Sequence, residues 1–504
     1  MKVLLKLPFL VILMAISAVS MLVPMAHAIR IGDFFTARVF LHSGLLILLL
    51  TALIGLALLN RPPARTAHTQ LIHLLAAFLV LPVFLGIPLL FLHTSASAFD
   101  IYFEMLSCLT TTGASLFDDA SRLNEPTHLW RALVGWMGGF LMLLSAVAIF
   151  APMSLGGFEV YAIKPAVNPS RSISQIRAAD VSERLASFSW RMAPVYLAAT
   201  AVLALALTLL GERPFIAAVL AMATLSTSGI SSTGDSGRMM VGYGGEALIF
   251  IFMIFAVSRV LLPTDRTLPK LRTIWQDHEF KLALAFVTTL PMLLFLRHWL
   301  GALDLSEQKD IPEALSAAWG SVFTVLSFLT TTGFVSTSWH DSQLWSGLES
   351  TRIALLGLSV MGGGIATTAG GIKLLRVYAL YKHGARELQK LSFPRSVAGA
   401  GGAARHIRRE GAYVAWLFFM LFAITTALVM LALGLSGLTF EESLAFGTSA
   451  LSTTGPLAAA VLENGAEYGA LNIWAKVILC VGMVLGRFET LAIIALLNPE
   501  FWRR

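Results

Sequence analysis

The chain has 504 residues, of which 57% are hydrophobic and only 13% are charged, and its mean hydropathy is +0.77. This composition excludes soluble, fibrous and disordered proteins. Repeated apolar runs predict transmembrane helices, since about 20 apolar residues span a hydrocarbon core about 30 Å thick. The formal net charge is +7, but the basic residues lie in short loops between apolar segments, as in cytoplasmic loops of membrane proteins. Nucleic-acid binding is therefore not expected.

The sequence contains no recognisable catalytic or metal-binding pattern. Cys108 and Cys480 both lie in apolar surroundings, which predicts buried packing residues rather than a disulfide or a metal site. Carboxylate pairs, metal triads, phosphate-binding loops and nucleophile elbows are missing at any usable spacing. An intramembrane protease or lipid transferase would need such a constellation. We therefore expect neither an enzyme nor an organic cofactor.

The N-terminus resembles a secretory signal, with Lys2 and Lys6 before the apolar stretch Leu7–Val23 and small residues at Ala26–Ala28. The apolar part is nevertheless long enough to span a membrane, and Leu41–Leu59 can return as a second helix. We expect residues 1–28 to be retained. Residues 1–60 are thus predicted to form a transmembrane hairpin.

From about residue 68 the chain repeats itself. The template is Leu-(Ser/Thr)₃-Gly, and it occurs at Leu109–Gly113, Leu225–Gly229, Leu329–Gly333 and Leu451–Gly455. Each copy follows a spanning helix and a shorter segment, and precedes another spanning helix. Repetition in a matching context predicts four units of one architecture. The predicted units are 68–151, 188–262, 279–380 and 411–497.

The shorter segments before the motifs are predicted to enter the membrane and return. They are Ala98–Leu109, Pro214–Leu225, Pro312–Leu329 and Thr439–Leu451. As helices they would be roughly 18–27 Å long, which is too short for a crossing and a turn. Their C-termini point at the Leu-(Ser/Thr)₃-Gly motifs. A helix C-terminus carries unpaired carbonyls and about half a negative charge, so a cation is favoured there.

Charge gives the orientation. The segments flanking the motifs (94–127, 211–246, 301–344 and 435–470) hold four Lys/Arg and seventeen Asp/Glu. The alternate segments (60–68, 152–191, 263–281 and 373–409) hold twenty Lys/Arg and seven Asp/Glu. Positively charged loops stay in the cytoplasm. We therefore expect the motifs to face outward, below an acidic vestibule that attracts cations.

The motifs predict an ion-binding ring. Irregular backbone at membrane depth must be buried in protein or line a wet cavity. A Thr-Thr-Gly stretch can turn its carbonyl oxygens inward to replace the water shell of an ion. The alternative for a single copy is the end of a buried helix. The candidate ion-binding residues are Thr111, Thr112, Gly113, Thr227, Ser228, Gly229, Thr331, Thr332, Gly333, Thr453, Thr454 and Gly455.

A glycine-rich segment interrupts the second spanning helix of the third unit. Residues 361–371 contain five glycines, and each costs up to about 1 kcal/mol in a helix relative to Ala. The helix is predicted to break there and to form a movable gate; the alternative is close packing through small residues. The candidate gate residues are Gly362, Gly363, Gly364, Thr367, Thr368, Gly370, Gly371 and Lys373.

Arg487 lies within the last apolar segment. A central intramembrane Arg costs about 2.5–3.5 kcal/mol on insertion scales and usually lines a pathway or forms a pair. It could form an electrostatic barrier in a pore. The alternative is a structural pairing with Glu489 or with a backbone carbonyl.

These residues together resemble the Trk/Ktr/HKT superfamily of potassium transporters, and most closely its bacterial Trk membrane subunit. The resemblance spans essentially the whole chain. Gly113, Gly229, Gly333 and Gly455 match the filter positions of that family, residues 362–371 with Lys373 match its gating loop, and Arg487 matches its pore-lining Arg. The N-terminal hairpin and the C-terminal residues 498–504 are also similar to Trk rather than Ktr proteins.

The resemblance implies an all-α integral membrane protein with four pseudo-symmetric membrane-pore-membrane units around one pore. It implies potassium uptake across the bacterial inner membrane, with the filter facing the periplasm. Gly113 at the first filter position matches potassium preference in the family. No nucleotide-binding domain is fused to the chain, so the resemblance implies a separate cytosolic nucleotide-binding regulatory subunit. It also implies a homodimer with one pore per protomer.

The fourth motif departs from the family pattern. Residues 452–456, Ser-Thr-Thr-Gly-Pro, are more similar to the other three motifs than is usual at this position. A sodium-selective or sodium-coupled transporter of the same architecture is therefore the alternative. Proton-coupled symport and a gated channel would use the same pore, so both modes stay open.

Overall fold

The computed structural model describes residues 8–58, 67–117, 120–153, 157–158, 181–233, 242–258, 271–301, 311–347, 351–392, 409–462, 465 and 467–488. These residues form helices and connecting loops, and no β-strand occurs among them. Seven of the helices within these ranges are long and apolar enough to cross a membrane. The predicted all-α membrane fold is confirmed.

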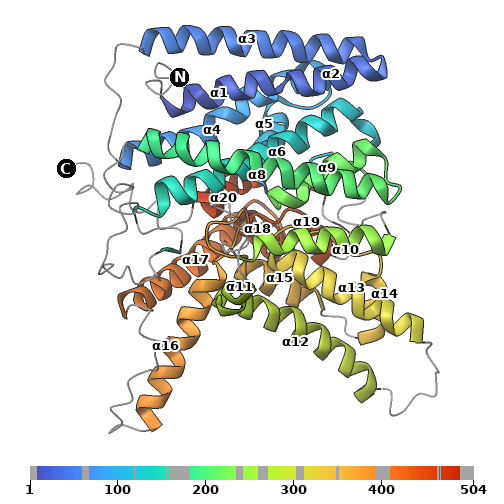
Figure 1. The fold of residues 1–504 in the computed structure, drawn as a ribbon, viewed down its shortest axis with the longest axis vertical. Helices are drawn as coiled ribbons and strands as arrows, with labels where there is room; N and C mark the ends of the chain where they lie inside the picture. The colour runs from blue at the N-terminus through green and yellow to red at the C-terminus, as the bar shows by residue number, and fades with distance from the viewer. Residues whose placement is uncertain are drawn as a thin grey trace.

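The N-terminal hairpin lies at one end of the molecule (Figure 1). Helices α1 (Phe9–Ser20) and α2 (Leu22–Ile31) form one apolar span, and α3 (Phe34–Leu58) returns. Asn124, in the first unit, donates a 3.0 Å hydrogen bond to the Asp33 carboxylate between α2 and α3. Burial raises the pKa of Asp33, but hydrogen bonds from Thr36 and Asn124 outweigh it and lower that pKa. The hairpin is thus tied to the first unit.

Each of the four units begins with a long helix. These helices are α4 (Ala67–Leu92), α8 (Val181–Leu209), α12 (His278–Gly301) and α17 (Arg409–Leu435). A shorter helix follows in each unit: α5 (Ala98–Leu109), α9 (Pro214–Ser226), α13 (Ile311–Leu329) and α18 (Phe440–Ser452). The four short helices lie within one residue of the predicted bounds. We refer to them as the pore helices.

The pore helices begin where their sequences provide a cap. Ser97 accepts a hydrogen bond from the Asp100 N–H at the start of α5, and Pro214 occupies the first turn of α9. Thr439 and Glu442 form a capping box at the start of α18. These signals place the N-termini of α5, α9 and α18, and in all four pore helices the Leu-(Ser/Thr)₃-Gly motif lies at the C-terminus.

The second helices of the units differ in regularity. They are α6 (Glu125–Ser145) continued by the π-helix η3 (Ala146–Phe150), α10 (Gly242–Met253) continued by the 3₁₀-helix η5 (Ile254–Ala256), α15 (Thr351–Met361) and α20 (Ile473–Phe488). The third one is broken, as the glycine-rich segment predicts. An irregular loop, residues 362–373, separates α15 from α16 (Leu374–Ser392). We call residues 362–373 the inner loop.

Three short helices were not predicted. They are α11 (Leu271–Gln276), α14 (Trp339–Ser346) and α19 (Pro456–Val461). Each has eight residues or fewer, so none gives the long apolar periodicity that identifies a spanning helix.

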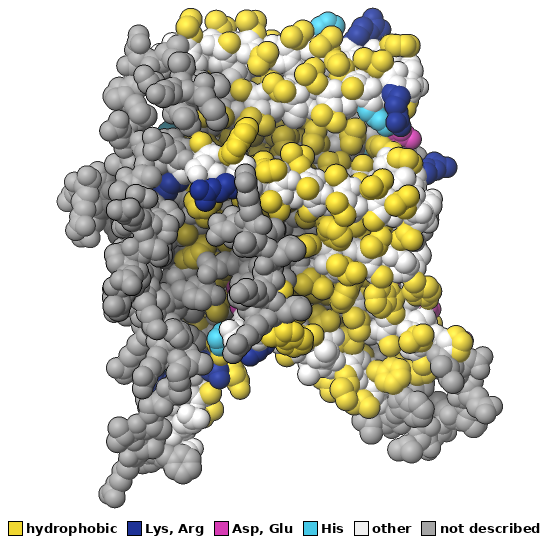
Figure 2. All heavy atoms as spheres, in the orientation of Figure 1, with side chains coloured by type: hydrophobic (Ala, Val, Ile, Leu, Met, Phe, Trp, Pro, Cys, Tyr) yellow, Lys and Arg dark blue, Asp and Glu magenta, His cyan; other side chains and the backbone are white. Residues whose placement is uncertain are grey.

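The outer surface is largely apolar. Figure 2 shows hydrophobic side chains across the middle of the helices, with charged and His side chains gathered near the helix ends. Exposed examples include Leu56, Leu209 and Leu435, which are 70%, 79% and 82% exposed. An apolar band of this kind is the surface that lipid covers. Polar side chains are instead buried between the units, around the ends of the pore helices.

Candidate functional site

The four Leu-(Ser/Thr)₃-Gly motifs share the same turn up to the residue before the glycine. We number them loop 1 (residues 109–113), loop 2 (225–229), loop 3 (329–333) and loop 4 (451–455). The central hydroxyl residue of each loop has a left-handed backbone, which a β-branched residue rarely adopts. The φ angles are +55° for Thr111, +52° for Thr227, +56° for Thr331 and +54° for Thr453. The same costly conformation at four equivalent positions shows one structural solution used four times.

Backbone hydrogen bonds hold each turn onto the end of its pore helix. In every loop the N–H of the residue before glycine donates to the carbonyl five residues earlier. These bonds are Thr112 to Ser107 (2.8 Å), Ser228 to Ala223 (3.0 Å), Thr332 to Ser327 (2.9 Å) and Thr454 to Ser449 (2.9 Å). The N–H groups are therefore directed back into the helix.

The outer two hydroxyls of each loop bond to one another. The oxygen pairs are Thr110 and Thr112 (2.9 Å), Ser226 and Ser228 (3.0 Å), Thr330 and Thr332 (3.0 Å), and Ser452 and Thr454 (3.2 Å). All of these residues are buried. A buried hydroxyl needs a partner, and here the alternating hydroxyls provide one another with it. This explains why the first and third positions of each Ser/Thr triplet both carry a hydroxyl.

The four loops form a closed ring. A Cβ atom added to Gly113, Gly229 or Gly455 would strike the next loop in chain order, with loop 4 closing onto loop 1, and a Cβ on Gly333 would lie 3.1 Å from Pro456, directly after loop 4. The groups in the way are the Ser228 carbonyl for Gly113, the Thr332 carbonyl for Gly229, the Pro456 ring for Gly333 and the backbone of Gly113 and Ala114 for Gly455. Glycine is thus required by close approach between loops. The sequence predicted these residues, and the structure brings them together.

Glycines of two second helices let those helices touch the loops. Gly138 of α6 lies against the carbonyl of Leu109, and Gly486 of α20 lies against the carbonyl of Leu451. The two leucines begin loops 1 and 4, so the contacts are equivalent. Sequence reasoning missed both glycines, since a single Gly in an apolar helix carries little signal by itself.

Buried carboxylates support the segments that follow loops 1 and 3. Glu104 of α5 accepts a 2.7 Å hydrogen bond from Arg131 of α6 and a 2.8 Å bond from the Leu116 N–H. Glu246 of α10 accepts bonds from Trp319 and Ser336, both 2.8 Å. It also accepts two 2.9 Å bonds from the N–H and the hydroxyl of Thr337.

Sequence reasoning missed both carboxylates. Glu104 and Glu246 are completely buried. An isolated acid in an apolar helix is the signal that could have identified them.

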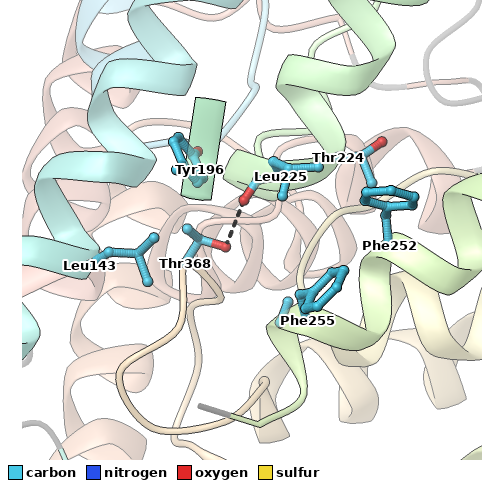
Figure 3. Close-up of a pocket in the computed structure, with 8 residues that line it drawn as sticks. Leu143, Tyr196, Thr224, Leu225, Phe252, Phe255 and Thr368 are labelled. Atoms are coloured by element: carbon cyan, nitrogen blue, oxygen red, sulfur yellow. Dashed lines mark hydrogen bonds between the residues drawn. The ribbon is translucent and has the colours of Figure 1, made fainter. Parts of the chain in front are cut away.

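The inner loop contacts three of the four loops. The Gly370 N–H donates a 2.7 Å hydrogen bond to the Thr331 hydroxyl of loop 3. The Thr368 hydroxyl donates to the Leu225 carbonyl of loop 2 at 3.2 Å (Figure 3). A Cβ on Gly370 would strike the Ser452 carbonyl of loop 4. The glycine-rich segment is therefore packed against the ring, which is where the sequence predicted a gate.

Arg487 contacts the remaining loop. Its guanidinium donates to the Thr111 hydroxyl of loop 1, and the residue is only 2% exposed. Lys373 is 7% exposed, and its ammonium donates to the Ala369 carbonyl within the inner loop. The alternative partner Glu489 lies outside the described residues, as do residues 498–504. Of the two basic side chains that the sequence singled out, Arg487 thus lies beside the ring and Lys373 lies within the inner loop.

A small cavity lies beside the inner loop (Figure 3). It holds no more than about one water molecule, so it has no room for an organic ligand. Its lining residues are Leu143, Tyr196, Thr224, Leu225, Phe252, Phe255, Ala256 and Thr368. Within the described ranges, no group of three or more His, Cys, Asp or Glu residues could hold a metal. Cys108 and Cys480 are free and buried, as predicted for packing residues.

Comparison with known proteins identifies the family. The family model of TrkH, described as a cation transport protein, matches residues 37–503. The Trk system potassium uptake protein TrkH of Vibrio parahaemolyticus is 29% identical over 82% of this chain and 81% of its own length. Its counterpart TrkG of Escherichia coli strain K12 is 26% identical over 80% of this chain and 79% of its own.

The solved structures agree on the fold. The crystal structure of the potassium transporter TrkH from Vibrio parahaemolyticus superposes with a TM-score of 0.79, covers 100% of both chains and is 24% identical. This likeness shows a common fold. Taken with the family match over residues 37–503, it shows that the chain belongs to the TrkH family of cation transport proteins, and is a transporter rather than an enzyme.

Proposed function

We propose that this protein takes up potassium across the bacterial inner membrane through the ring formed by loops 1 to 4. The observation that carries the proposal is the close contact between four loops that share a left-handed central residue. The names of its relatives, which are Trk system potassium uptake proteins, support potassium as the ion.

The proposed filter binds the ion through main-chain carbonyls. Potassium has to lose part of its water shell to enter a narrow ring, and carbonyl oxygens replace that water. Four pore helices end at the ring, and the partial negative charge of each C-terminus favours a cation there. Buried hydroxyls pair within each loop, and buried carboxylates hold the segments that follow loops 1 and 3. Potassium is the transported substrate in this proposal.

The proposed gate is the inner loop together with Arg487. Contacts with all four loops support this proposal: hydrogen bonds from Thr368 to loop 2, from Gly370 to loop 3 and from Arg487 to loop 1, and the close approach of Gly370 to the Ser452 carbonyl of loop 4. A guanidinium next to the ring repels a passing cation. Opening would therefore require the inner loop to leave loops 2, 3 and 4, and Arg487 to be screened or moved.

The orientation of the pore is proposed from charge, and its partners are proposed from the family. We propose that the loops face the periplasm, because the adjoining segments are acidic and the alternate segments basic. We also propose a homodimer, and a cytosolic nucleotide-binding regulatory subunit that docks on the basic inner segments. Proton-coupled symport and gated flow use the same ring in this arrangement.

Uptake in a bacterium stripped of its own potassium systems tests the function. The chain is expressed with its regulatory subunit, and growth at low potassium and rubidium uptake are measured. Rescue by the wild-type protein is the expected result. Gly113→Ser should lose most rubidium uptake, because its Cβ would strike the Ser228 carbonyl, and the remaining flux should be shifted towards sodium. If protein in the membrane neither rescues growth nor moves rubidium, the potassium proposal is wrong, and sodium flux becomes the next measurement.

A further inference from the structure

Loop 4 differs from the other three loops at its glycine. Gly113, Gly229 and Gly333 have φ angles of +73°, +63° and +82°. Gly455 has φ −55° and ψ −44°, and it is the N-cap residue of the short helix α19. Thr453, two residues before Gly455, still has the shared left-handed conformation. The change is therefore confined to the peptide groups around Thr454 and Gly455.

Two side chains bind the carbonyls of loop 4. The Ser449 hydroxyl lies 2.9 Å from the Thr454 carbonyl and 3.3 Å from the Gly455 carbonyl. The Tyr468 hydroxyl donates to the Gly455 carbonyl at 2.9 Å and lies 2.8 Å from the Ser449 hydroxyl. Ser449 belongs to the pore helix behind the loop, so these carbonyls are turned back towards that helix.

The equivalent carbonyls of the other loops are not bound in this way. Within the described residues, no side chain donates to the carbonyls of the glycine or of the residue before it in loops 1, 2 and 3. Ser107 and Ser327 occupy the position of Ser449 in units 1 and 3, and their hydroxyls have no partner in the described part of the chain. In unit 2 the position is Ala223. Carbonyl binding by this serine is thus a property of loop 4.

The Gly455 N–H faces the ring instead. It donates a 2.5 Å hydrogen bond to the Thr112 carbonyl of loop 1, which is one of the proposed ion ligands. The Pro456 ring lies against Gly333, where the pattern of the other loops would place the Thr454 carbonyl. The Thr454 and Gly455 carbonyls of loop 4 are thus turned away from the ring, and the Gly455 N–H also occupies the Thr112 carbonyl of loop 1.

We propose that Ser449 and Tyr468 are positioning residues that hold loop 4 in a non-ligating state, and that conduction requires the Thr454 and Gly455 carbonyls to leave them and turn inward. Gly455 permits this because it can adopt the positive φ of the other three glycines. The switch is an outer gate, separate from the inner loop, and this inference rests on the proposed function.

Removing the side-chain hydroxyls tests the inference. Tyr468→Phe keeps the ring, which packs edge-on against Phe446 at 4.9 Å between centroids, and Ser449→Ala keeps the helix. Each variant deletes net hydrogen-bond stabilisation of the non-ligating state, so the ligating population should rise about two- to tenfold. The maximal rate of rubidium uptake should rise by the same factor, at an unchanged amount of protein in the membrane. Ser327→Ala is the matched control and should leave uptake unchanged.

A second measurement on purified protein separates positioning from loss of structure. Potassium should raise the thermal midpoint more in Tyr468→Phe than in the wild type, because a ligand stabilises the state that binds it. N-methylglucamine at equal ionic strength is the reference cation. Unchanged or lower uptake at normal membrane levels, with an unchanged potassium response, would overturn the inference. So would an equal rise in Ser327→Ala. If the wild type itself moves no rubidium, the proposed function has failed.

Discussion

The ion pair behind loop 1 should dominate the stability of the first unit. Glu104 and Arg131 have side chains only 0% and 5% exposed, and their closest oxygen–nitrogen distance is 2.6 Å. Removing one partner leaves a buried charge without compensation. Glu104→Leu should therefore lower the free energy of unfolding by about 3–5 kcal/mol. It should also release the segment after loop 1, because the Leu116 N–H loses its acceptor.

Removing both charges should cost much less. In the double variant Glu104→Leu/Arg131→Met the isolated charge is gone, and only unpaired polar groups such as the Leu116 N–H add a penalty of about 1–3 kcal/mol. Asp100 and Lys476 form the comparison pair at 2.7 Å, with side chains 28% and 10% exposed. Since water and salt screen this pair, Asp100→Asn should cost no more than about 1 kcal/mol.

Denaturant unfolding of the wild type and the three purified variants in detergent, followed by Trp fluorescence, measures all four free energies of unfolding under one condition. The expected order is Glu104→Leu as the most destabilised, then the double variant, then Asp100→Asn. A Glu104→Leu variant as stable as Asp100→Asn would refute the reasoning. A double variant as unstable as the single one would show that the hydrogen bonds to the loop, and not the buried charge, carry the energy.

Three further substitutions follow from the ring and the inner loop. Gly113→Ala should reduce rubidium uptake at least tenfold. Gly32→Ala is the control, because Gly32 has a similar φ of +83° but open space around it, so this variant should lose only about 1–2 kcal/mol of stability from backbone strain. Equal losses of uptake in the two variants would argue against a ring. Gly370→Ala should push the inner loop off the ring and raise uptake without the regulatory subunit, while Gly384→Ala, which also has open space around it, should not. Arg487→Ala should raise uptake several-fold, as measured with rubidium, and an unchanged rate would remove Arg487 from the ion path.

Local sequence signals were sufficient for the helices and for the repeated turn. Apolar runs identified the spanning segments, because burial in lipid depends on composition. The bounds of α5 were predicted to the residue, since Ser97 and Asp100 supply its cap and Thr110–Gly113 its end. The break after Met361 followed from glycine density alone.

Contacts between distant segments were not predictable in this way. Glu246 supports Thr337, 91 residues later in the chain, and nothing in the local pattern of either segment requires the other. Arg487 donates to the Thr111 hydroxyl of loop 1, a contact with a distant unit that the sequence did not suggest. A hydrogen bond between two units depends on how the helices pack, which no local propensity encodes.

The sequence by itself determined the membrane-spanning helices and the four repeated motifs, because hydrophobic length and the Leu-(Ser/Thr)₃-Gly repeat act through neighbouring residues. Only the tertiary structure decided how the four loops differ. Ser-Thr-Thr-Gly in loop 4 is nearly the sequence of the other loops, yet Gly455 has another backbone conformation. The physical reason is that Ser449 and Tyr468 lie on either side of the loop in sequence and meet its carbonyls only after α18 has packed.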